Sequence, residues 1–420
     1  MKITLDNIGK VRFAVVEIDG ISVIAGENNT GKSTVGKALF SIFNSFYNIE
    51  EQIFFERSES IERILGSMYS NAMNRYSRRV DVGDIARQLV ENIKLYRDDP
   101  FMLKDFVLKS LISYDENFHN NMYNEDVEHS IYRVQELLNI PDYRIFSRVL
   151  EKKLYAEFNG QVSNLFSISD SRIKLTIKEN STSVYLRNNN IVEIESPFDL
   201  RTEVVYLDDP FVLDEFRNSF YRYNLNSGDH RTHLKELLFF EKKDPNILEE
   251  IFATSKFEKI FNLINSICDG EIVKSKRSGL GYKISNTDKV LDARSLSTGL
   301  KTFAILKTLL TNGALEYNGT IVLDEPEIHL HPEWQLLLAE IIVLLNKEFG
   351  IHILLNTHSP YFLRAIQVYA AKHQLSSKCR YYLSESINEH ESHIVDVTDN
   401  IEMIYFKLSQ PLQKLEDTEW

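Results

Sequence analysis

The sequence predicts an α/β fold, in which a doubly wound core is built from both ends of the chain and a large insertion separates them. Two short apolar segments, Gly20–Ala25 and Thr320–Leu323, have the composition of buried strands, and helical patterning follows each of them. Between them the period of the apolar residues changes, first to that of helices and then to that of antiparallel strands. A chain of 420 residues also exceeds one typical hydrophobic core.

The composition is that of an ordinary water-soluble protein, with 43% hydrophobic and 26% charged residues. Two cysteines, Cys268 and Cys379, are too few for a disulfide framework or a cysteine zinc site and suit a reducing compartment. No signal-peptide profile opens the chain, and no apolar run approaches the roughly 20 residues that span a bilayer. We therefore expect a cytoplasmic protein with no membrane partner.

The net charge of −13 argues against a generally basic nucleic-acid-binding protein, because neutralising phosphates needs clustered lysine and arginine. Two local clusters, Arg78–Arg79 and Lys274–Arg277, could form a basic patch. Each is more typical of a solvated turn or helix face.

The first segment that carries chemistry is Gly26–Thr34, which matches the pattern G-x4-G-K-[S/T] between an expected strand and an amphipathic helix. In that context the N–H groups of the turn and the positive end of the helix bind phosphates. Lys32 would reach the β- and γ-phosphates, and the Ser33 hydroxyl would bind Mg²⁺. The segment therefore predicts a nucleoside triphosphate site formed by Gly26, Asn28, Asn29, Thr30, Gly31, Lys32, Ser33 and Thr34.

The insertion begins near residue 51 with helical patterning that is rich in aromatic residues and continues to about residue 165. Alternating apolar and polar residues then predict a small antiparallel meander with strands at 173–177, 183–186 and 191–194.

The return to the core begins at Val204–Leu207, an apolar segment that we expect to be another core strand. Helical patterning over 210–268 and a hairpin around Ser278–Gly279 lead on to the remaining motifs. We accordingly divide the chain into an N-terminal part of the core, an insertion, a connection and a C-terminal part, at 1–50, 51–200, 201–290 and 291–420.

The expected strand Thr320–Leu323 ends in two adjacent carboxylates, Asp324 and Glu325. A strand beside the phosphate-binding loop delivers its last residue to the Mg²⁺ shell, which is the role we predict for Asp324. Glu325 would then polarise the attacking water as a general base. The alternative is a strand followed by an acidic helix cap.

Two further features lie on either side of this pair. Ser297 and Gly299 stand at the start of an expected helix and could form a second anion-binding surface, although a capped helix start is also a common structural feature. His358 ends an apolar strand, one strand after the carboxylates, where it could sense the γ-phosphate; a lone histidine there is otherwise an ordinary polar residue.

His329 and His331, two residues apart, would point to different helix faces, so we favour no metal site there.

These motifs together resemble an ABC-type ATPase head of the SMC/RecF/OLD branch. Asn28 matches the asparagine of that branch's loop, Leu296–Gly299 resembles the ABC signature, Leu323–Pro326 resembles the Walker B strand, and His358 resembles the switch histidine. Glu325–Pro332, followed by Thr357–Pro360, is especially similar to OLD-type and Septu-type bacterial defence ATPases of the AAA family. The resemblance covers roughly 1–47 and 290–370.

The resemblance implies slow hydrolysis of ATP with Mg²⁺ in a homodimer, or a higher assembly, whose two heads enclose two ATP molecules. Ser297 and Gly299 would then act in trans on the partner's phosphate-binding loop, and Glu325 and His358 would be catalytic. It also implies a regulatory ATPase of an anti-phage or toxin-like system that controls a separate effector, such as a nuclease. The alternative is a RecF-like DNA-maintenance ATPase that clamps duplex DNA directly. The chain departs from the pattern in lacking an assignable Q-loop glutamine, and the segment after His358 is too short for a Toprim domain.

Overall fold

A computed structural model describes residues 1–73, 81–121, 125–216, 228–239, 258–275 and 279–416. The chain forms two compact units, of which one comprises Met1–Tyr47 with Glu151–Trp420 and the other Asn48–Leu150. The second unit is smaller than the insertion we expected at 51–200, because the meander that follows it hydrogen-bonds to the N-terminal strand and extends the main sheet.

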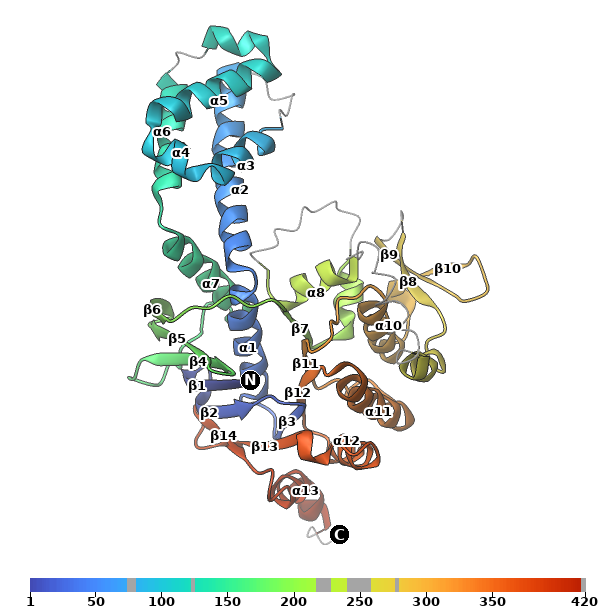
Figure 1. Ribbon diagram of the computed structural model, residues 1–420. Coiled ribbons are helices and arrows are strands. Elements are labelled where there is room, and N and C mark those ends of the chain that lie inside the picture. The colour runs from blue at the N-terminus through green and yellow to red at the C-terminus, as the bar shows by residue number, and fades with distance from the viewer. Residues whose placement is uncertain (74–80, 122–124, 217–227, 240–257, 276–278, 417–420) are drawn as a thin grey trace. The chain divides into compact units, whose positions relative to one another are not determined.

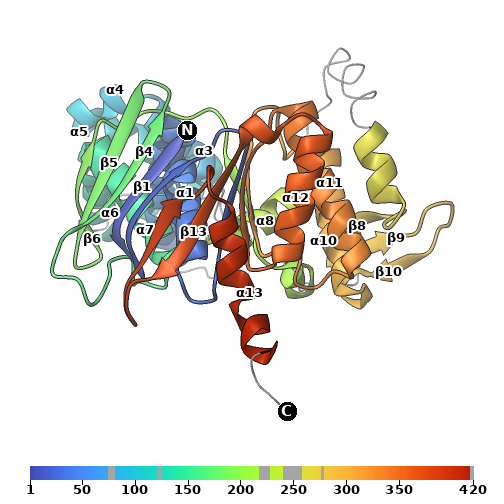
Figure 2. The ribbon, with the colours of Figure 1, turned by 90° about the horizontal axis from the view of Figure 1, so that it is seen from below.

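The main sheet has eleven strands in the order β6-β5-β4-β1-β2-β14-β13-β3-β12-β11-β7 (Figures 1 and 2). Five strands at one end of this order are mutually parallel. They are β13 (Cys379–Ser386), β3 (Ile21–Gly26), β12 (His352–Thr357), β11 (Thr320–Asp324) and β7 (Val204–Leu207). Both predicted core strands, near residues 20 and 320, therefore lie in this parallel part, one strand apart.

The other end of the sheet is mainly antiparallel and contains the predicted meander. Asn188 and Asn189 form its second turn with φ values of 51° and 67°, a conformation that asparagine tolerates well. The strands are β1 (Lys2–Ile8), β2 (Val11–Glu17), β14 (Ser392–Asp396), β4 (Ser171–Ile177), β5 (Asn180–Arg187) and β6 (Asn190–Glu195).

Helices cover both faces of the parallel strands, so this part of the sheet is doubly wound. Figure 2 shows α10, α11 and α12 side by side, whereas α1 packs on β3, β7, β11 and β12 from the other face. All six residues of β3 are buried, as expected of a strand covered on both faces. The helices are α1 (Lys32–Phe46), α10 (Thr298–Thr311), α11 (Pro332–Phe349), α12 (Pro360–Lys372) and α13 (Glu402–Glu416), with the short η4 (Ser376–Lys378).

The segment between β7 and α10 also belongs to the first unit. Its main helix, α8 (His230–Phe239), packs on β7, and residues 258–265 are helical. A separate antiparallel sheet of three strands and two short helices complete it: β8 (Glu271–Ser275), β9 (Gly279–Lys283), β10 (Val290–Asp292), η2 (Pro210–Glu215) and η3 (Ala293–Ser295). The hairpin expected around Ser278–Gly279 has its two strands, but Ser278 lies outside the described residues, as do Lys276, Arg277 and the Arg78–Arg79 cluster.

The second unit is helical and has its own apolar core, to which Leu65, Leu89, Val107 and Val134 contribute. Its helices are α2 (Ile49–Met73), α3 (Gly83–Glu91), α4 (Ile93–Asp98), α5 (Pro100–Tyr114), η1 (Glu116–Asn121) and α6 (Glu125–Asn139), and α7 (Asp142–Phe158) leads back to the first unit. Within the described ranges, none of the helices combines the length and apolar character needed to cross a membrane.

Candidate functional site

The phosphate-binding loop connects the end of β3 to the start of α1, as its sequence predicts. Gly31 has a φ of 88°, and a Cβ there would lie 2.6 Å from Cγ2 of Val11. A Cβ on Gly26 would lie 2.3 Å from the carbonyl oxygen of Ser384. Both positions therefore require glycine, since any side chain would collide with a neighbouring strand.

Lys32 is the first residue of α1, and its ammonium group is folded into the loop. Nζ donates hydrogen bonds to the carbonyl oxygens of Gly26, at 3.1 Å, and Glu27, at 2.8 Å. The side chain is only 4% exposed, so its charge is concentrated at the inner surface of the loop. A buried cation beside backbone N–H groups at a helix start is the electrostatic environment that a polyphosphate requires.

The phosphate-binding loop is also supported by β13, a strand whose link to the loop was not predicted from the sequence. The Ser384 hydroxyl, on β13, donates a hydrogen bond of 2.7 Å to the carbonyl oxygen of Thr30, and the Thr30 hydroxyl donates one of 2.8 Å to that of Glu27. Ser384 lies some 350 residues from the loop in sequence, so only the parallel pairing of β13 with β3 reveals this role.

Asp324 is the last residue of β11, which does not lie directly beside the loop's own strand as predicted, because β12 is inserted between β3 and β11. Both carboxylate oxygens accept hydrogen bonds: Oδ1 from the side-chain amide of Asn356 and Oδ2 from the hydroxyl of Tyr206, each at 2.9 Å. The donors come from β12 and β7, the two neighbours of β11. Neither donor was singled out from the sequence, although both lie on strands that the sequence predicts.

Glu325 lies just beyond the strand in an unusual backbone conformation, with a φ of 51°. Its N–H donates to the carbonyl oxygen of Asn356 at 2.9 Å, which helps to hold a left-handed conformation that costs free energy in a non-glycine residue. Its carboxylate Oε1 lies 3.4 Å from Lys32 Nζ and 3.3 Å from His358 Nδ1. The fold thus brings together three residues predicted from segments far apart in the sequence.

His358 follows β12 and remains 40% exposed on its side chain. The preceding residue, Thr357, donates its hydroxyl to Glu327, a buried carboxylate whose pKa is raised chiefly by burial. The hydroxyl of Ser359 caps α12 by accepting from the N–H of Phe362 at 3.1 Å. These contacts fix the backbone on both sides of His358 and leave its imidazole accessible.

The predicted signature residues lie elsewhere on the first unit. Ser297 precedes α10 as its N-cap residue but makes no capping hydrogen bond with its side chain. Gly299 packs so closely against Trp334 that a Cβ would lie 2.9 Å from the indole ring. In the part of the chain that the structure describes, no hydrogen bond or ion pair joins either residue to Lys32, Asp324 or Glu325.

Ser33 and Asp324 offer a hydroxyl and a carboxylate, the hard oxygen donors that suit Mg²⁺. Among the described residues no group of three or more His, Cys, Asp and Glu side chains is arranged to hold a metal ion. This fits Mg²⁺ beside a nucleotide, because such a site takes most of its ligands from phosphates and water. His329 and His331 both precede α11 rather than lying within a helix: His331 caps α11, and His329 packs edge-on against Phe211.

The α/β fold and the loop define a P-loop protein of the ATPase class. A family model described as "AAA domain, putative AbiEii toxin, Type IV TA system" matches residues 21–364, and the chain belongs to that family. The match does not single out the OLD-type or Septu-type branch that the motifs resemble.

Among solved structures, an SMC head bound to the C-terminal winged-helix domain of ScpA is 12% identical, with 96% of this chain and 98% of that chain covered and a TM-score of 0.43. The SMC head domain from Thermotoga maritima is 12% identical over 94% and 98% of the chains, with a TM-score of 0.36. The ADP conformation of MJ1267, an ATP-binding cassette of an ABC transporter, is 13% identical over 100% of both chains, with a TM-score of 0.33.

Proposed function

We propose that this protein binds ATP with Mg²⁺ and hydrolyses it. The observation that carries the proposal is the position of the Glu325 carboxylate between the Lys32 ammonium group and the His358 imidazole, with Asp324 next to it in sequence. The arrangement supports the proposal, because these residues lie at the carboxyl ends of parallel strands, where open α/β sheets bind ligands, and would supply a cation for the phosphates, a base for water and a ligand for the metal.

Each residue has a distinct part in the proposed reaction. Lys32 and the N–H groups of the loop bind the β- and γ-phosphates. Glu325 accepts a proton from water as the water oxygen attacks the γ-phosphorus, and the bond to the β–γ bridging oxygen breaks to release ADP and phosphate. Ser33 and Asp324 would hold the Mg²⁺, which supplies positive charge at the phosphate oxygens. His358 lies 3.3 Å from the same Glu325 oxygen and would sense the γ-phosphate.

We further propose that two copies associate head-to-tail on ATP, with Ser297 and Gly299 of one copy completing the site of the other. Ser297 is exposed at the start of α10, where a second copy would contact it. Ser297→Arg would add bulk and charge at that surface, and we expect it to abolish dimer formation with ATP in sedimentation. Dimers that form undiminished would contradict this arrangement.

For the biological role we propose a regulatory ATPase of a toxin-like or anti-phage system that controls a separate effector, such as a nuclease. The family description, which mentions a toxin and a type IV toxin–antitoxin system, supports a role of this kind. The net charge of −13 favours it over the RecF-like clamp, because a clamp would need a basic surface for duplex DNA.

The test is calorimetric ATP binding and phosphate release by the full chain, with Lys32→Ala and the exposed-surface variant Lys289→Ala. We expect Lys32→Ala to abolish binding and Lys289→Ala to retain it; equal affinities would contradict the assignment of the loop. Purification of a Glu325→Gln variant with ATP from its host then separates the two roles. A stoichiometric protein partner supports effector control, and duplex DNA that dissociates at higher salt supports the clamp.

A further inference from the structure

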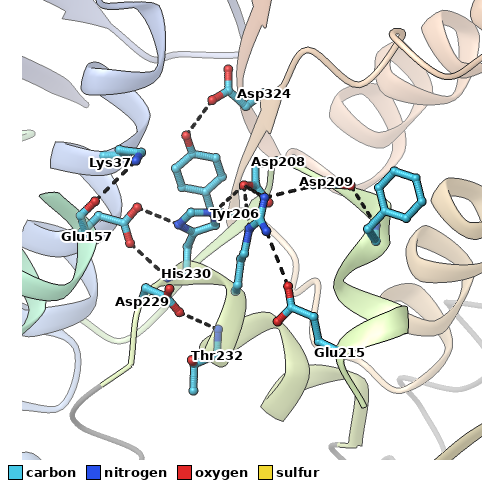
Figure 3. A network of polar contacts seen from close by, with 12 residues as sticks. Lys37, Glu157, Tyr206, Asp208, Asp209, Glu215, Asp229, His230, Thr232 and Asp324 are labelled. Atoms are coloured by element: carbon cyan, nitrogen blue, oxygen red, sulfur yellow. Dashed lines mark hydrogen bonds and ion pairs between the residues drawn. The ribbon is translucent and has the colours of Figure 1, made fainter. Parts of the chain in front are cut away.

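Tyr206 is completely buried on β7, the strand that ends the parallel part of the sheet next to β11. It pairs in register with Val322, two residues before Asp324, so its side chain lies on the same sheet face as that carboxylate. Its hydroxyl donates to Oδ2 of Asp324, as Figure 3 shows.

The Tyr206 ring is held on several sides. The imidazole of His230 stacks on it with ring centroids 4.3 Å apart and an angle of 23° between the planes, and Phe40 of α1 packs edge-on at 6.3 Å. Helix α1 also comes close to the hydroxyl at Gly36, where a Cβ would lie 3.2 Å from the tyrosine oxygen and 2.8 Å from Val322 Cγ1. The hydroxyl therefore has little freedom to leave Asp324.

His230 is in turn fixed by two carboxylates (Figure 3). Its Nδ1 lies 2.6 Å from Glu157 and its Nε2 lies 3.0 Å from Asp208, while its backbone N–H donates to the second oxygen of Glu157 at 3.0 Å. Burial alone would lower the pKa of His230, but the adjacent Asp208 and Glu157 carboxylates outweigh that effect and raise it to about 9. The histidine is thus a cation locked in one orientation.

We propose that Tyr206 is a positioning residue for the metal ligand Asp324, and that His230, with Glu157 and Asp208, holds the tyrosine in the required place. The inference rests on the function proposed above. Since Asn356 occupies the other carboxylate oxygen, the two donors together fix the plane of the carboxylate, and each oxygen keeps a further lone pair that would be available to a cation. Without the tyrosine donor the carboxylate can rotate, and its metal affinity falls.

The experiment compares Tyr206→Phe with its parent, both carrying Glu325→Gln so that bound nucleotide is not consumed. Binding of a fluorescent ATP analogue is measured in EDTA and across a Mg²⁺ series, and binding of Mn²⁺ is followed by electron paramagnetic resonance. We expect the half-saturating metal concentration to rise roughly tenfold or more, the scale for residues that orient metal ligands. Nucleotide affinity in EDTA should stay within about twofold of the parent, since the phosphate-binding residues are untouched.

Tyr382→Phe is the matched control, because it also removes a buried tyrosine hydroxyl, one that accepts from the N–H of Glu17 at 2.9 Å, far in sequence from the motifs. It should leave the metal dependence unchanged. Should Tyr206→Phe fail to fold, Gly36→Ala perturbs the hydroxyl without removing it and should shift the metal dependence in the same direction.

The outcomes separate the inference from the proposed function. Identical Mg²⁺ curves for parent and Tyr206→Phe would overturn the role of Tyr206 and leave the ATPase proposal intact. Loss of affinity in EDTA as well as in Mg²⁺ would show a general structural role and also overturn it. A parent that binds no nucleotide at all would overturn the proposed function itself.

Discussion

The first unit contains two clusters of polar and charged residues, and they differ in how closely their charges are paired. At the nucleotide edge, formed by Lys32, Asp324, Glu325 and His358, the contacts of Glu325 with its two cationic neighbours are 3.3 and 3.4 Å long. In the β7–α8 seam, formed by Glu157, Tyr206, Asp208, His230 and Arg231, the ion pairs are 2.6 to 3.0 Å long.

The cluster with the longer contacts is also the more exposed to solvent. The side chain of Glu325 is 25% exposed, whereas that of Glu157 is completely buried. Loose and partly open contacts can be exchanged for contacts with a ligand at little cost, while short buried ones cannot be broken without leaving a charge unpaired. The comparison supports our proposal that the nucleotide edge carries out the reaction while the β7–α8 seam holds its geometry.

The largest effect should come from the nucleotide edge. Glu325→Gln removes the proposed base, so we expect kcat for ATP to fall by roughly 10²–10⁴-fold while nucleotide affinity persists. The free energy of unfolding should change by less than about 1 kcal/mol, because the lost ion pairs are long and partly exposed. Phosphate release and urea denaturation measure the two quantities, with the exposed Glu389→Gln as control. Undiminished turnover would place the base elsewhere.

The next effect should come from the seam and should affect stability directly. Glu157→Gln keeps the shape of the side chain but removes the charge nearest to His230 Nδ1. We expect the free energy of unfolding to fall by about 3 kcal/mol, the lower end for one partner of a buried ion pair, since Asp208 still faces the imidazole.

Asp170→Asn is the matched control for this change, because its pair with Arg187 is exposed and should contribute less than about 1 kcal/mol. Equal losses in the two variants, measured by urea denaturation, would show that burial does not distinguish the seam from the surface.

The sequence predicted the nucleotide edge far better than the seam. Lys32, Asp324, Glu325 and His358 occur in local motifs at the ends of parallel strands, although β12, the last of these strands in sequence, lies between β3 and β11. Glu325 contacts Lys32 and His358, whereas Asp324 contacts Asn356 and Tyr206. The P-loop and its flanking strand and helix were predicted from fewer than thirty consecutive residues.

Tyr206, Asn356 and Ser384 were not singled out, because their roles depend on which strands become neighbours. A tyrosine in an apolar segment looks like an ordinary core residue until β7 is placed beside β11. The extent of the insertion was misjudged for a similar reason. The meander at 171–195 is local in sequence, but its pairing with β1 is long-range and makes it part of the main sheet.

A pH dependence should also distinguish the seam. The pKa of His230 is about 9 in the folded chain against an ordinary value of 6.5, so its contribution is complete below pH 6.5 and is lost as the pH rises through 9. We expect the wild type to lose about 2–3 kcal/mol relative to His230→Asn between pH 6.5 and 9, a window that follows from the two pKa values. A constant difference across that range would mean that His230 is not charged in the folded protein.

The smallest effect should come from Lys153, another buried cation, which donates to the carbonyl oxygen of Asn44 at 2.6 Å. Burial lowers its pKa to about 8, so the charged form is disfavoured in the folded state, opposite to His230. Lys153→Met removes that penalty but leaves the carbonyl of Asn44 without this donor, and the two changes nearly cancel. We expect stability at pH 7 to stay within about 1 kcal/mol of wild type.

The sign of the pH dependence makes this last variant informative. In the wild type Lys153 loses its proton at a lower pH in the folded chain than in the unfolded chain. Its contribution to the free energy of unfolding therefore rises between about pH 8 and 10.5. Lys153→Met should lack that rise, and urea denaturation of both proteins over this range measures it. If both lose stability in parallel, Lys153 keeps its proton throughout, and its hydrogen bond to Asn44 outweighs the cost of its burial.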